Sequence, residues 1–439
     1  MKDLATHYPA HISELQQRSE TIMARENITS IVIHSGHASK IFLDDMYYPF
    51  KVNPHFKAWL PIVNTANCWL IITANSKPTL VFYQPLDFWH KVTKLTDDYW
   101  TDFFDIKIIS NVDEVTNVLP SNKANCVYIG AHEDVASNHG FSKVNEQTLL
   151  NYFHYHRVYK TEYELVCLRE ANRLAVLGHV AAKQAFYAQA SEFEIQLAYL
   201  SAAGQGENDL PYGSIVALNE NAAILHYTAL EQTKPNAHHS FLIDAGASFH
   251  GYAADITRTY AFDTNEFAEL IVAMNEMQQT LVQGLKPGAS YVELHIENHV
   301  RLAAILQQFG LVNLDAQTIM AKGITRFFYP HGIGHHLGLQ VHDMGGFMSD
   351  EQGTHINSPS EHPFLRTTRG IESKQVFTIE PGLYFIEQFL SDLAKSEHSK
   401  YINWPKIETM RKYGGIRIED NIIVHHDKVE NMTRACHLD

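Results

Sequence analysis

Four histidines lie close together in the stretch YPHGIGHHLGLQVHD, residues 329–343. They are interleaved with glycines, whose permissive backbone lets a chain approach another group closely. Near neutral pH an imidazole can bind a metal ion, carry a proton or hydrogen-bond a substrate. The histidines are His331, His335, His336 and His342. The stretch therefore predicts either a polar surface loop or a site at which histidines face a ligand.

Two aspartates stand at the ends of apolar, strand-like runs, although acidic residues are depleted in strands. Asp244 closes FLID, and Asp255 opens DITRTY eleven residues later, with the turn-like ASFHGY between them. A hairpin folded between Phe249 and His250 would place the two aspartates opposite each other on one face. Two bare carboxylates in that arrangement repel each other, so we expect a cation between them.

Two glutamates extend this acidic set. Glu380 lies in VFTIEPG on the same face as Thr378, and Glu419 lies in GIRIED on the same face as Arg417. A solvated strand end could explain any single carboxylate, but four of them beside a histidine cluster indicate a metal site. Two divalent cations would neutralise four carboxylates, and an oxygen-rich set with one imidazole favours Mn²⁺ or Co²⁺ and also admits Zn²⁺. Two ions roughly 3.5–4 Å apart can share a hydroxide and polarise a carbonyl or phosphoryl oxygen.

The elements that must position these residues indicate two domains, as expected for a chain of 439 residues. The first third combines a helical run, HISELQQRSETIMAREN, with the short apolar runs SIVIHSG, WLIITANSKPTLVFYQ, DIKIIS and CVYIGA, which are typical of strands. This part is α/β in character. The sequence pattern changes near residue 158 from alternating short strands and helices to long amphipathic helices, and we place the domain boundary there.

The remainder begins with two capping boxes, Thr161 with Glu164 and Ser191 with Glu194, each followed by a helical pattern. The runs SIVALNE, AILHYT, HSFLIDAG, DITRTYAF, VFTIEPGLYF and GGIRIEDNIIV predict strands, and further helices are expected from about residues 266 and 291. Two polar stretches, about 349–362 and 387–405, read as loop insertions. The pattern predicts a mixed helix-and-sheet domain.

Composition narrows the classes of function. A net charge of −15 argues against nucleic-acid and anionic-membrane partners. Four widely spaced cysteines without a CxxC pair indicate neither a disulfide framework nor a structural zinc site. No apolar run is long enough for a membrane span, and the polar N-terminus does not resemble a signal peptide. We therefore expect a cytoplasmic protein.

The order of these residues resembles a known family. It resembles the order found in the dinuclear metallopeptidases of the pita-bread fold, among them methionine aminopeptidase, aminopeptidase P and prolidase. The matching residues are an aspartate, a second aspartate eleven residues later, the motif HGxGH, a glutamate in TIEPG and a glutamate in IRIED. Within that set the chain resembles the bacterial prolidases, or Xaa-Pro dipeptidases, some of which are called organophosphorus acid anhydrolases. The likeness covers essentially the whole chain, including LDDMYYPFKVNPHFKAWLP and DFWHKV. It implies an α/β N-terminal domain of the creatinase/prolidase type, residues 1–158, and an α+β pita-bread catalytic domain, residues 159–439.

The resemblance also implies a ligand set for two divalent ions, with Mn²⁺ expected first and Co²⁺ or Zn²⁺ as alternatives. Its members are Asp244, Asp255, His335, Glu380 and Glu419. Asp255 and Glu419 would bridge the ions, Asp244 would bind one of them, and His335 with Glu380 the other. Glu380 would also move the proton of the water that the ions share.

Further positions match residues of the family's cleft. The expected catalytic histidines are His226, His331 and His342, and the expected substrate-binding residues are Arg369, Tyr212, Arg417, Tyr291 and Leu365. Arg369 matches an arginine that binds the proline carboxylate, and Arg417 would orient the metal ligands. His336 is interpreted as a bystander. The implied substrates are Xaa-Pro dipeptides, with organophosphorus esters as side substrates, and the implied assembly is a homodimer in which Trp89 closes over the partner's cleft.

Three alternatives share the fold. An aminopeptidase P would cut Xaa-Pro bonds in longer peptides, but Arg369 favours a free carboxylate directly after the proline. A catalytically inactive pita-bread protein would act as a binding module, and a creatinase-type enzyme would work without metal. Both of these are disfavoured because all five ligand positions are filled.

Overall fold

The computed structural model describes residues 2–438, which divide into two compact units. Unit 1 extends to residue 167 and adds the short segments 249–252 and 350–354. Unit 2 contains the remaining residues, including every predicted metal ligand.

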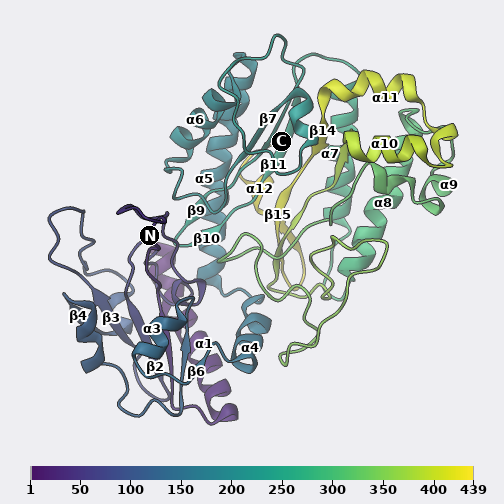
Figure 1. Ribbon diagram of the computed structural model, residues 1–439. Coiled ribbons are helices and arrows are strands. Elements are labelled where there is room, and N and C mark those ends of the chain that lie inside the picture. The colour runs from purple at the N-terminus through teal and green to yellow at the C-terminus, as the bar shows by residue number, and fades with distance from the viewer. Residues whose placement is uncertain (1, 439) are drawn as a thin grey trace. The chain divides into compact units, whose positions relative to one another are not determined.

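Unit 1 is built on one mixed six-stranded sheet with the strand order β4-β3-β2-β1-β5-β6. Its strands are β1 (Ser30–His34), β2 (Trp69–Thr73), β3 (Thr79–Tyr83), β4 (Asp105–Ile109), β5 (Cys126–Ile129) and β6 (Lys143–Val144). Its helices are α1 (Lys2–Glu26), α2 (Pro54–Lys57), α3 (Glu133–Asn138) and α4 (Gln147–Arg157). Two 3₁₀ helices, η1 (Thr101–Phe103) and η2 (Val112–Asn117), lie between strands. Helices α1 and α4 pack side by side next to the sheet (Figure 1). The strands expected from apolar runs in this part are confirmed, and their inward side chains form a buried core.

The longer helices after residue 160, of which the first starts at the end of unit 1, begin where the sequence predicts. They are α5 (Glu162–Tyr187), α6 (Glu192–Ala203), α7 (Glu266–Gln283) and α8 (Tyr291–Gln308), followed by the shorter α9 (Ala316–Ala321), α10 (Glu387–Lys395), α11 (Trp404–Met410) and α12 (Met432–Ala435). Both capping boxes form: the Thr161 amide donates to Glu164 Oε2 at 2.8 Å, and the Ser191 amide donates to Glu194 Oε2 at 2.8 Å. These bonds satisfy amides that the first turn of a helix leaves unpaired.

Strands lie at the centre of unit 2, with α5 and α6 on one side and α7 and α8 on the other (Figure 1). The sheets run in the orders β11-β8-β7, β12-β15-β16 and β13-β14, and the short ribbon β10-β9 includes residues 249–252, which belong to unit 1. The strands are β7 (Ile215–Leu218), β8 (Ser240–Asp244), β9 (Ser248–Phe249), β10 (Tyr252–Ala253), β11 (Thr257–Ala261), β12 (Val376–Ile379), β13 (Gly382–Tyr384), β14 (Gly415–Arg417), β15 (Asp420–Val424) and β16 (Val429–Asn431). A bridge from Thr257 to Glu419 joins the two three-stranded sheets. This mixed arrangement confirms the expected α+β catalytic domain.

Two local predictions are wrong. The stretch 387–405, expected as a loop, contains α10, η5 (Ser399–Tyr401) and the start of α11, because Leu390 and Leu393 place two side chains on one buried face. The run AILHYT is not a strand. Asn219 takes a left-handed backbone (φ 58°) and starts η3 (Asn219–Ala223), and its side-chain oxygen accepts from the His239 amide at 2.7 Å. The remaining 3₁₀ helices are η4 (Ile324–Phe327) and η6 (Arg411–Tyr413).

The helices offer no candidate for a membrane span. Among the residues that the structure describes, none combines the length and the apolar character that crossing a bilayer requires.

Candidate active site

The first two carboxylates come from adjacent antiparallel strands. Asp244 ends β8 and pairs with Thr257 at the start of β11, whereas Asp255 precedes that strand. The hairpin is therefore centred one residue later than the sequence predicts, and the two aspartates are not direct cross-strand partners. The Tyr212 hydroxyl lies between them, 2.7 Å from Asp244 Oδ1 and 2.5 Å from Asp255 Oδ1. The aspartates thus share a site through a different geometry from the one predicted.

Glu380 and Glu419 approach from the other sheet. Glu380 directly follows β12, and Glu419 lies between β14 and β15. The Thr257 hydroxyl donates to Glu419 Oε2 at 2.7 Å, which fixes the rotamer of this carboxylate next to the aspartate hairpin. Arg417 shares the site, as its position two residues before Glu419 predicts, and its Nη2 donates to Asp244 Oδ2 at 2.7 Å.

His335 enters from a turn that glycine makes accessible. Gly334 has φ 153°, and a Cβ atom there would overlap the Thr378 carbonyl and the Tyr291 hydroxyl. The His335 amide donates to Thr378 Oγ1 at 3.1 Å, and its Nδ1 lies 3.0 Å from the His336 carbonyl. Because Nδ1 donates to that carbonyl, Nε2 is the nitrogen that faces the carboxylates.

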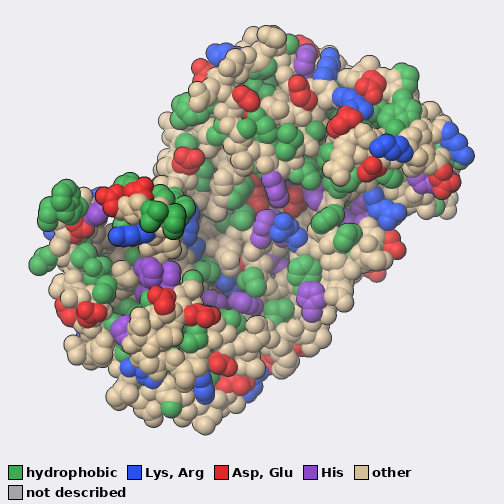
Figure 2. All heavy atoms as spheres, in the orientation of Figure 1, with side chains coloured by type: hydrophobic (Ala, Val, Ile, Leu, Met, Phe, Trp, Pro, Cys, Tyr) green, Lys and Arg blue, Asp and Glu red, His purple; other side chains and the backbone are tan. Residues whose placement is uncertain are grey.

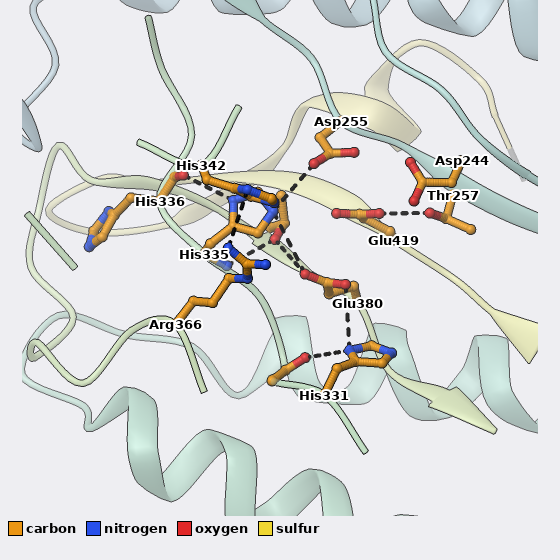
Figure 3. A network of polar contacts seen from close by, with 12 residues as sticks. Asp244, Asp255, Thr257, His331, His335, His336, His342, Arg366, Glu380 and Glu419 are labelled. Atoms are coloured by element: carbon orange, nitrogen blue, oxygen red, sulfur yellow. Dashed lines mark hydrogen bonds and ion pairs between the residues drawn. The ribbon is translucent and has the colours of Figure 1, made fainter. Parts of the chain in front are cut away.

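The five predicted ligands converge on one space. His335 Nε2 lies 3.3 Å from Asp255 Oδ2 and 3.8 Å from Glu380 Oε1. Ligand atoms of Asp255, His335 and Glu419 lie within 4.8 Å of one another. Figure 3 shows the carboxylates of Asp244, Asp255, Glu380 and Glu419 gathered opposite the His335 ring, while the ring of His336 lies apart.

Electrostatics at this cluster favour bound cations. Burial, together with the neighbouring carboxylates, raises the pKa of Glu419 well above its usual value and that of Glu380 to about 7. Burial also raises the pKa of Asp244, although Arg417 opposes the effect. Burial alone would lower the pKa of His335, but its bond to Asp255 raises it. In the metal-free site, bound protons reduce the repulsion between the carboxylates that cations would otherwise reduce. A donor set rich in oxygen with one imidazole fits two divalent ions.

These pKa directions predict how the metal-free protein responds to pH. The folded state holds protons on Glu380 and Glu419 above the pH at which the unfolded chain releases them. The free energy of unfolding should therefore fall as pH rises from about 5 to about 8. Thermal unfolding of chelated protein measures this dependence, and saturation with Mn²⁺ should remove most of it. A metal-free protein that gains stability over this range would contradict the assignment.

A cleft of about 540 Å³ opens onto the ligands. Beside the ligands it is lined by His226, His331, His342, Leu365 and Arg417, all predicted for the site, and by Leu225, Pro330, Gly332, Gly334, Phe347, Pro363, Phe364, Arg366 and Phe389. Three predicted substrate-binding residues do not line it. Tyr212 instead holds Asp244 and Asp255, and the Tyr291 hydroxyl donates to the Thr378 carbonyl at 3.0 Å. Arg369 is buried and contacts Glu372 at 3.2 Å.

A chain of hydrogen bonds orders the histidine nearest Glu380. Arg417 Nη1 donates to the Tyr384 oxygen at 3.0 Å, and Tyr384 Oη lies 2.8 Å from His331 Nε2. Nδ1 of His331 lies 2.8 Å from the Gly332 carbonyl and 3.7 Å from Glu380 Oε2. Burial lowers the pKa of His331 to about 3, and Arg417 adds to the effect, so the ring is neutral.

Sequence reasoning missed part of the cleft wall. Arg366 is exposed, and its Nη1 lies 3.3 Å from His342 Nδ1. The run LRTTR contains both Arg366 and Arg369, and nothing in that run distinguishes the arginine that faces the cleft. Phe347 and Phe364 lie in irregular segments, and Phe389 lies in a helix where the sequence predicts a loop. No periodic sequence pattern predicts that these three rings face the cleft.

Known proteins resemble the chain over its full length. A family model for the Xaa-Pro dipeptidase N-terminal domain matches residues 6–155, and the model for metallopeptidase family M24 matches residues 166–426. A protein from Pseudoalteromonas translucida (strain TAC 125), named Xaa-Pro dipeptidase, is 58% identical over 100% of both chains. Another of that name, from Colwellia psychrerythraea (strain 34H / ATCC BAA-681), is 57% identical over 98% of this chain and 97% of its own.

Solved structures share the two-domain fold. A zinc-substituted aminopeptidase P from E. coli matches with a TM-score of 0.72 and 22% identity, covering 98% of this chain and 95% of that one. Proline aminopeptidase P II from Yersinia pestis matches with a TM-score of 0.71 and 22% identity, covering 99% and 97%. These structures show the shared fold, and the family model that matches residues 166–426 places the chain in metallopeptidase family M24.

Proposed function

We propose that this chain is an Xaa-Pro dipeptidase, which hydrolyses dipeptides that end in proline. The observation that carries the proposal is the convergence of four carboxylates and His335 at the floor of a cleft, in a chain more than half identical to proteins of that name. Release of proline from alanyl-proline, with dialanine as a control for the proline requirement, tests it directly.

Family M24 membership carries a dinuclear divalent metal centre. We assign its ligands to Asp244, Asp255, His335, Glu380 and Glu419, with Mn²⁺ as the native ion, because oxygen donors dominate this set. When bound, the two ions would supply a nucleophile by lowering the pKa of water and would polarise the scissile carbonyl.

The remaining steps fall to side chains of the cleft. Glu380 lines the cleft beside His331 and His335, and we assign to its carboxylate the transfer of a proton from the nucleophile to the proline nitrogen. Neutral His331 and His342 are placed in the cleft wall to hydrogen-bond the substrate. Arg417 holds Asp244 and Tyr384 in place, so we assign it a positioning role.

Recognition of the substrate carboxylate gives a prediction for two neighbouring arginines. The family resemblance assigns the carboxylate to Arg369, whose guanidinium contacts Glu372 instead of lining the cleft, so this role requires Arg369 to turn toward the substrate. A charge-assisted hydrogen bond is worth about 1.5–3 kcal/mol, so on this assignment Arg369→Ala should lower kcat/KM for alanyl-proline by about 10–150-fold. Converting the substrate to its amide should cost the wild type a similar factor and the variant little. Steady-state kinetics on both substrates measure this coupling.

Arg366 provides the matched comparison, because it lies in the same segment and faces the cleft directly. Arg366→Ala should retain the wild-type sensitivity to the amide if Arg369 binds the carboxylate. If instead Arg366→Ala removes that sensitivity and Arg369→Ala keeps it, carboxylate recognition belongs to Arg366.

A side activity toward organophosphorus triesters follows from the same chemistry. A phosphotriester is already tetrahedral, so a site that stabilises a tetrahedral intermediate offers much of what attack on phosphorus needs. Leu365 and the neighbouring Phe364 supply an apolar wall for ester groups, and an uncharged triester does not use an arginine that binds a carboxylate. Fluoride release from diisopropyl fluorophosphate with Mn²⁺ measures the activity, which Arg369→Ala should leave nearly unchanged. Release no faster than background would contradict it.

We also propose a cytoplasmic homodimer with a domain boundary near residue 158. The four cysteines are unpaired, which fits a reducing compartment. Exposed hydrophobic side chains cluster in two segments of unit 1, Phe42, Leu43, Met46, Tyr47 and Tyr48 in one and Leu86, Phe88 and Trp89 in the other. Figure 2 shows such side chains protruding from this unit. Apolar surface of this kind marks interaction sites, and a second copy of the chain is the partner that the family resemblance implies.

A further inference from the structure

A second cluster of histidines lies in unit 2, outside the carboxylate site. His295 and His299 are four residues apart on α8 and therefore share one face of the helix. His362 ends the irregular stretch 349–362 and packs against both, with ring centroids 4.5 Å from His295 and 4.6 Å from His299. One nitrogen from each ring lies within 4.8 Å of the other two.

The two helix histidines present buried nitrogens that lack protein partners. His295 and His299 are each only 1% exposed, and His295 Nδ1 and His299 Nε2 make no hydrogen bond. Buried polar atoms are normally paired, so each such exception calls for an explanation. The other nitrogen of His299, Nδ1, lies 2.9 Å from the Thr325 hydroxyl, which orients the ring. In the tautomer whose Nδ1–H donates to this hydroxyl, Nε2 is an acceptor available to a metal ion.

All three rings are uncharged near neutral pH. Burial, with the neighbouring imidazoles, lowers the pKa of His295 to about 2 and that of His299 to about 3. Burial and Arg326 lower the pKa of His362, against the opposing charge of Glu361. A metal ion binds neutral imidazole, so no proton has to leave before the site can be filled.

We propose that His295, His299 and His362 bind a third divalent transition-metal ion, with Zn²⁺ as the best-matched species. Three imidazole nitrogens suit zinc, copper or nickel, whereas manganese, magnesium and calcium prefer oxygen. Zinc–nitrogen bonds of about 2.0–2.1 Å place tetrahedral ligands about 3.3 Å apart, so the cluster must contract modestly around the ion. His362 is on an irregular segment that can supply this movement, and a water would complete the tetrahedron.

Occupancy of this site would restrain one wall of the catalytic cleft. Pro363, Phe364 and Leu365 directly follow His362 and line the cleft. Tyr329 connects the two places from the other side, because its ring lies 5.3 Å from that of His299 and 4.5 Å from that of His331. A bound ion would thus tether the cleft wall to α8.

Counting bound ions tests the proposal. Chelated protein is saturated with Mn²⁺, dialysed against Zn²⁺ and analysed by mass spectrometry for total metal per chain. We expect three ions in the wild type and two in His362→Ala, with the third site weakened by at least about 100-fold. His426→Ala removes an exposed imidazole elsewhere in unit 2 and should retain three ions. Two ions in the wild type, or three in His362→Ala, would overturn the proposal.

A second background separates this site from the catalytic centre. Asp255→Ala weakens metal binding at the carboxylate site, so this variant should hold one zinc tightly, at the histidine cluster. The double variant Asp255→Ala/His362→Ala should lose that zinc. Zinc should also raise the unfolding temperature of Asp255→Ala but not that of the double variant. Equal zinc content or an equal thermal shift in the two proteins would contradict the assignment, whatever their peptidase activity.

Discussion

Glu380→Gln is expected to lower kcat for alanyl-proline by at least about 100-fold. Glutamine keeps the size of the side chain and one oxygen that can bind metal, but it cannot accept a proton. The wild-type carboxylate lines the cleft beside His331 and His335, where it can exchange a proton with a bound substrate. Stopped-time assays of proline release at saturating substrate measure the change.

The metal content of this variant decides what the loss means. Glu380 Oε1 lies 3.4 Å from the Thr378 hydroxyl, and the amide can retain that contact, so the local fold should persist. We expect Glu380→Gln to bind two ions at saturating Mn²⁺ while remaining slow. A variant that holds both ions and turns over at nearly the wild-type rate would show that another group moves the proton.

Asp255→Ala is expected to abolish most of the activity and to lower the metal content. Its carboxylate contacts His335 and the Tyr212 hydroxyl, and its backbone amide donates to Asn421 Oδ1 at 3.0 Å. Removing it takes one of the five proposed ligands from the metal centre, so kcat/KM should fall by at least about 1,000-fold. Metal analysis after equilibrium dialysis against limiting Mn²⁺ gives the second measurement.

Asp263→Ala is the matched control, because Asp263 is exposed two residues beyond β11 and contacts none of the ligands. It should bind two ions and retain wild-type turnover. An Asp255→Ala protein with full metal content and full activity would remove Asp255 from the centre, whereas equal losses in both variants would indicate a general effect on folding.

The strands and helices with the strongest patterns could be predicted from the sequence alone. Capping boxes at Thr161 and Ser191 set helix starts through bonds between residues three apart, which local sequence determines. The predictions of secondary structure and strand register were wrong where contacts between segments far apart in the sequence determine the structure. The segment with Leu390 and Leu393 is helical because both side chains reach a core formed elsewhere, and the hairpin register depends on β7 and β11 flanking β8.

The ligands were detectable because acidic residues in apolar runs break a local rule. The geometry that relates the two aspartates could not be predicted, because Asp244 pairs with Thr257 and both aspartates contact the Tyr212 hydroxyl. Arg366 could not be distinguished from Arg369 for a similar reason. Which arginine faces the cleft depends on how the irregular segment folds over it, and no periodic pattern encodes that path.

Proline release from alanyl-proline by metal-stripped and Mn²⁺-restored enzyme tests the central claim most directly. Dialanine serves as the substrate without proline, and alanyl-prolyl-alanine serves as the substrate whose proline carboxylate is not free. We predict rapid, chelator-sensitive cleavage of alanyl-proline that Mn²⁺ restores, with slow cleavage of both controls. Full activity in rigorously metal-free protein, or faster cleavage of the tripeptide than of the dipeptide, would contradict a metal-dependent Xaa-Pro dipeptidase.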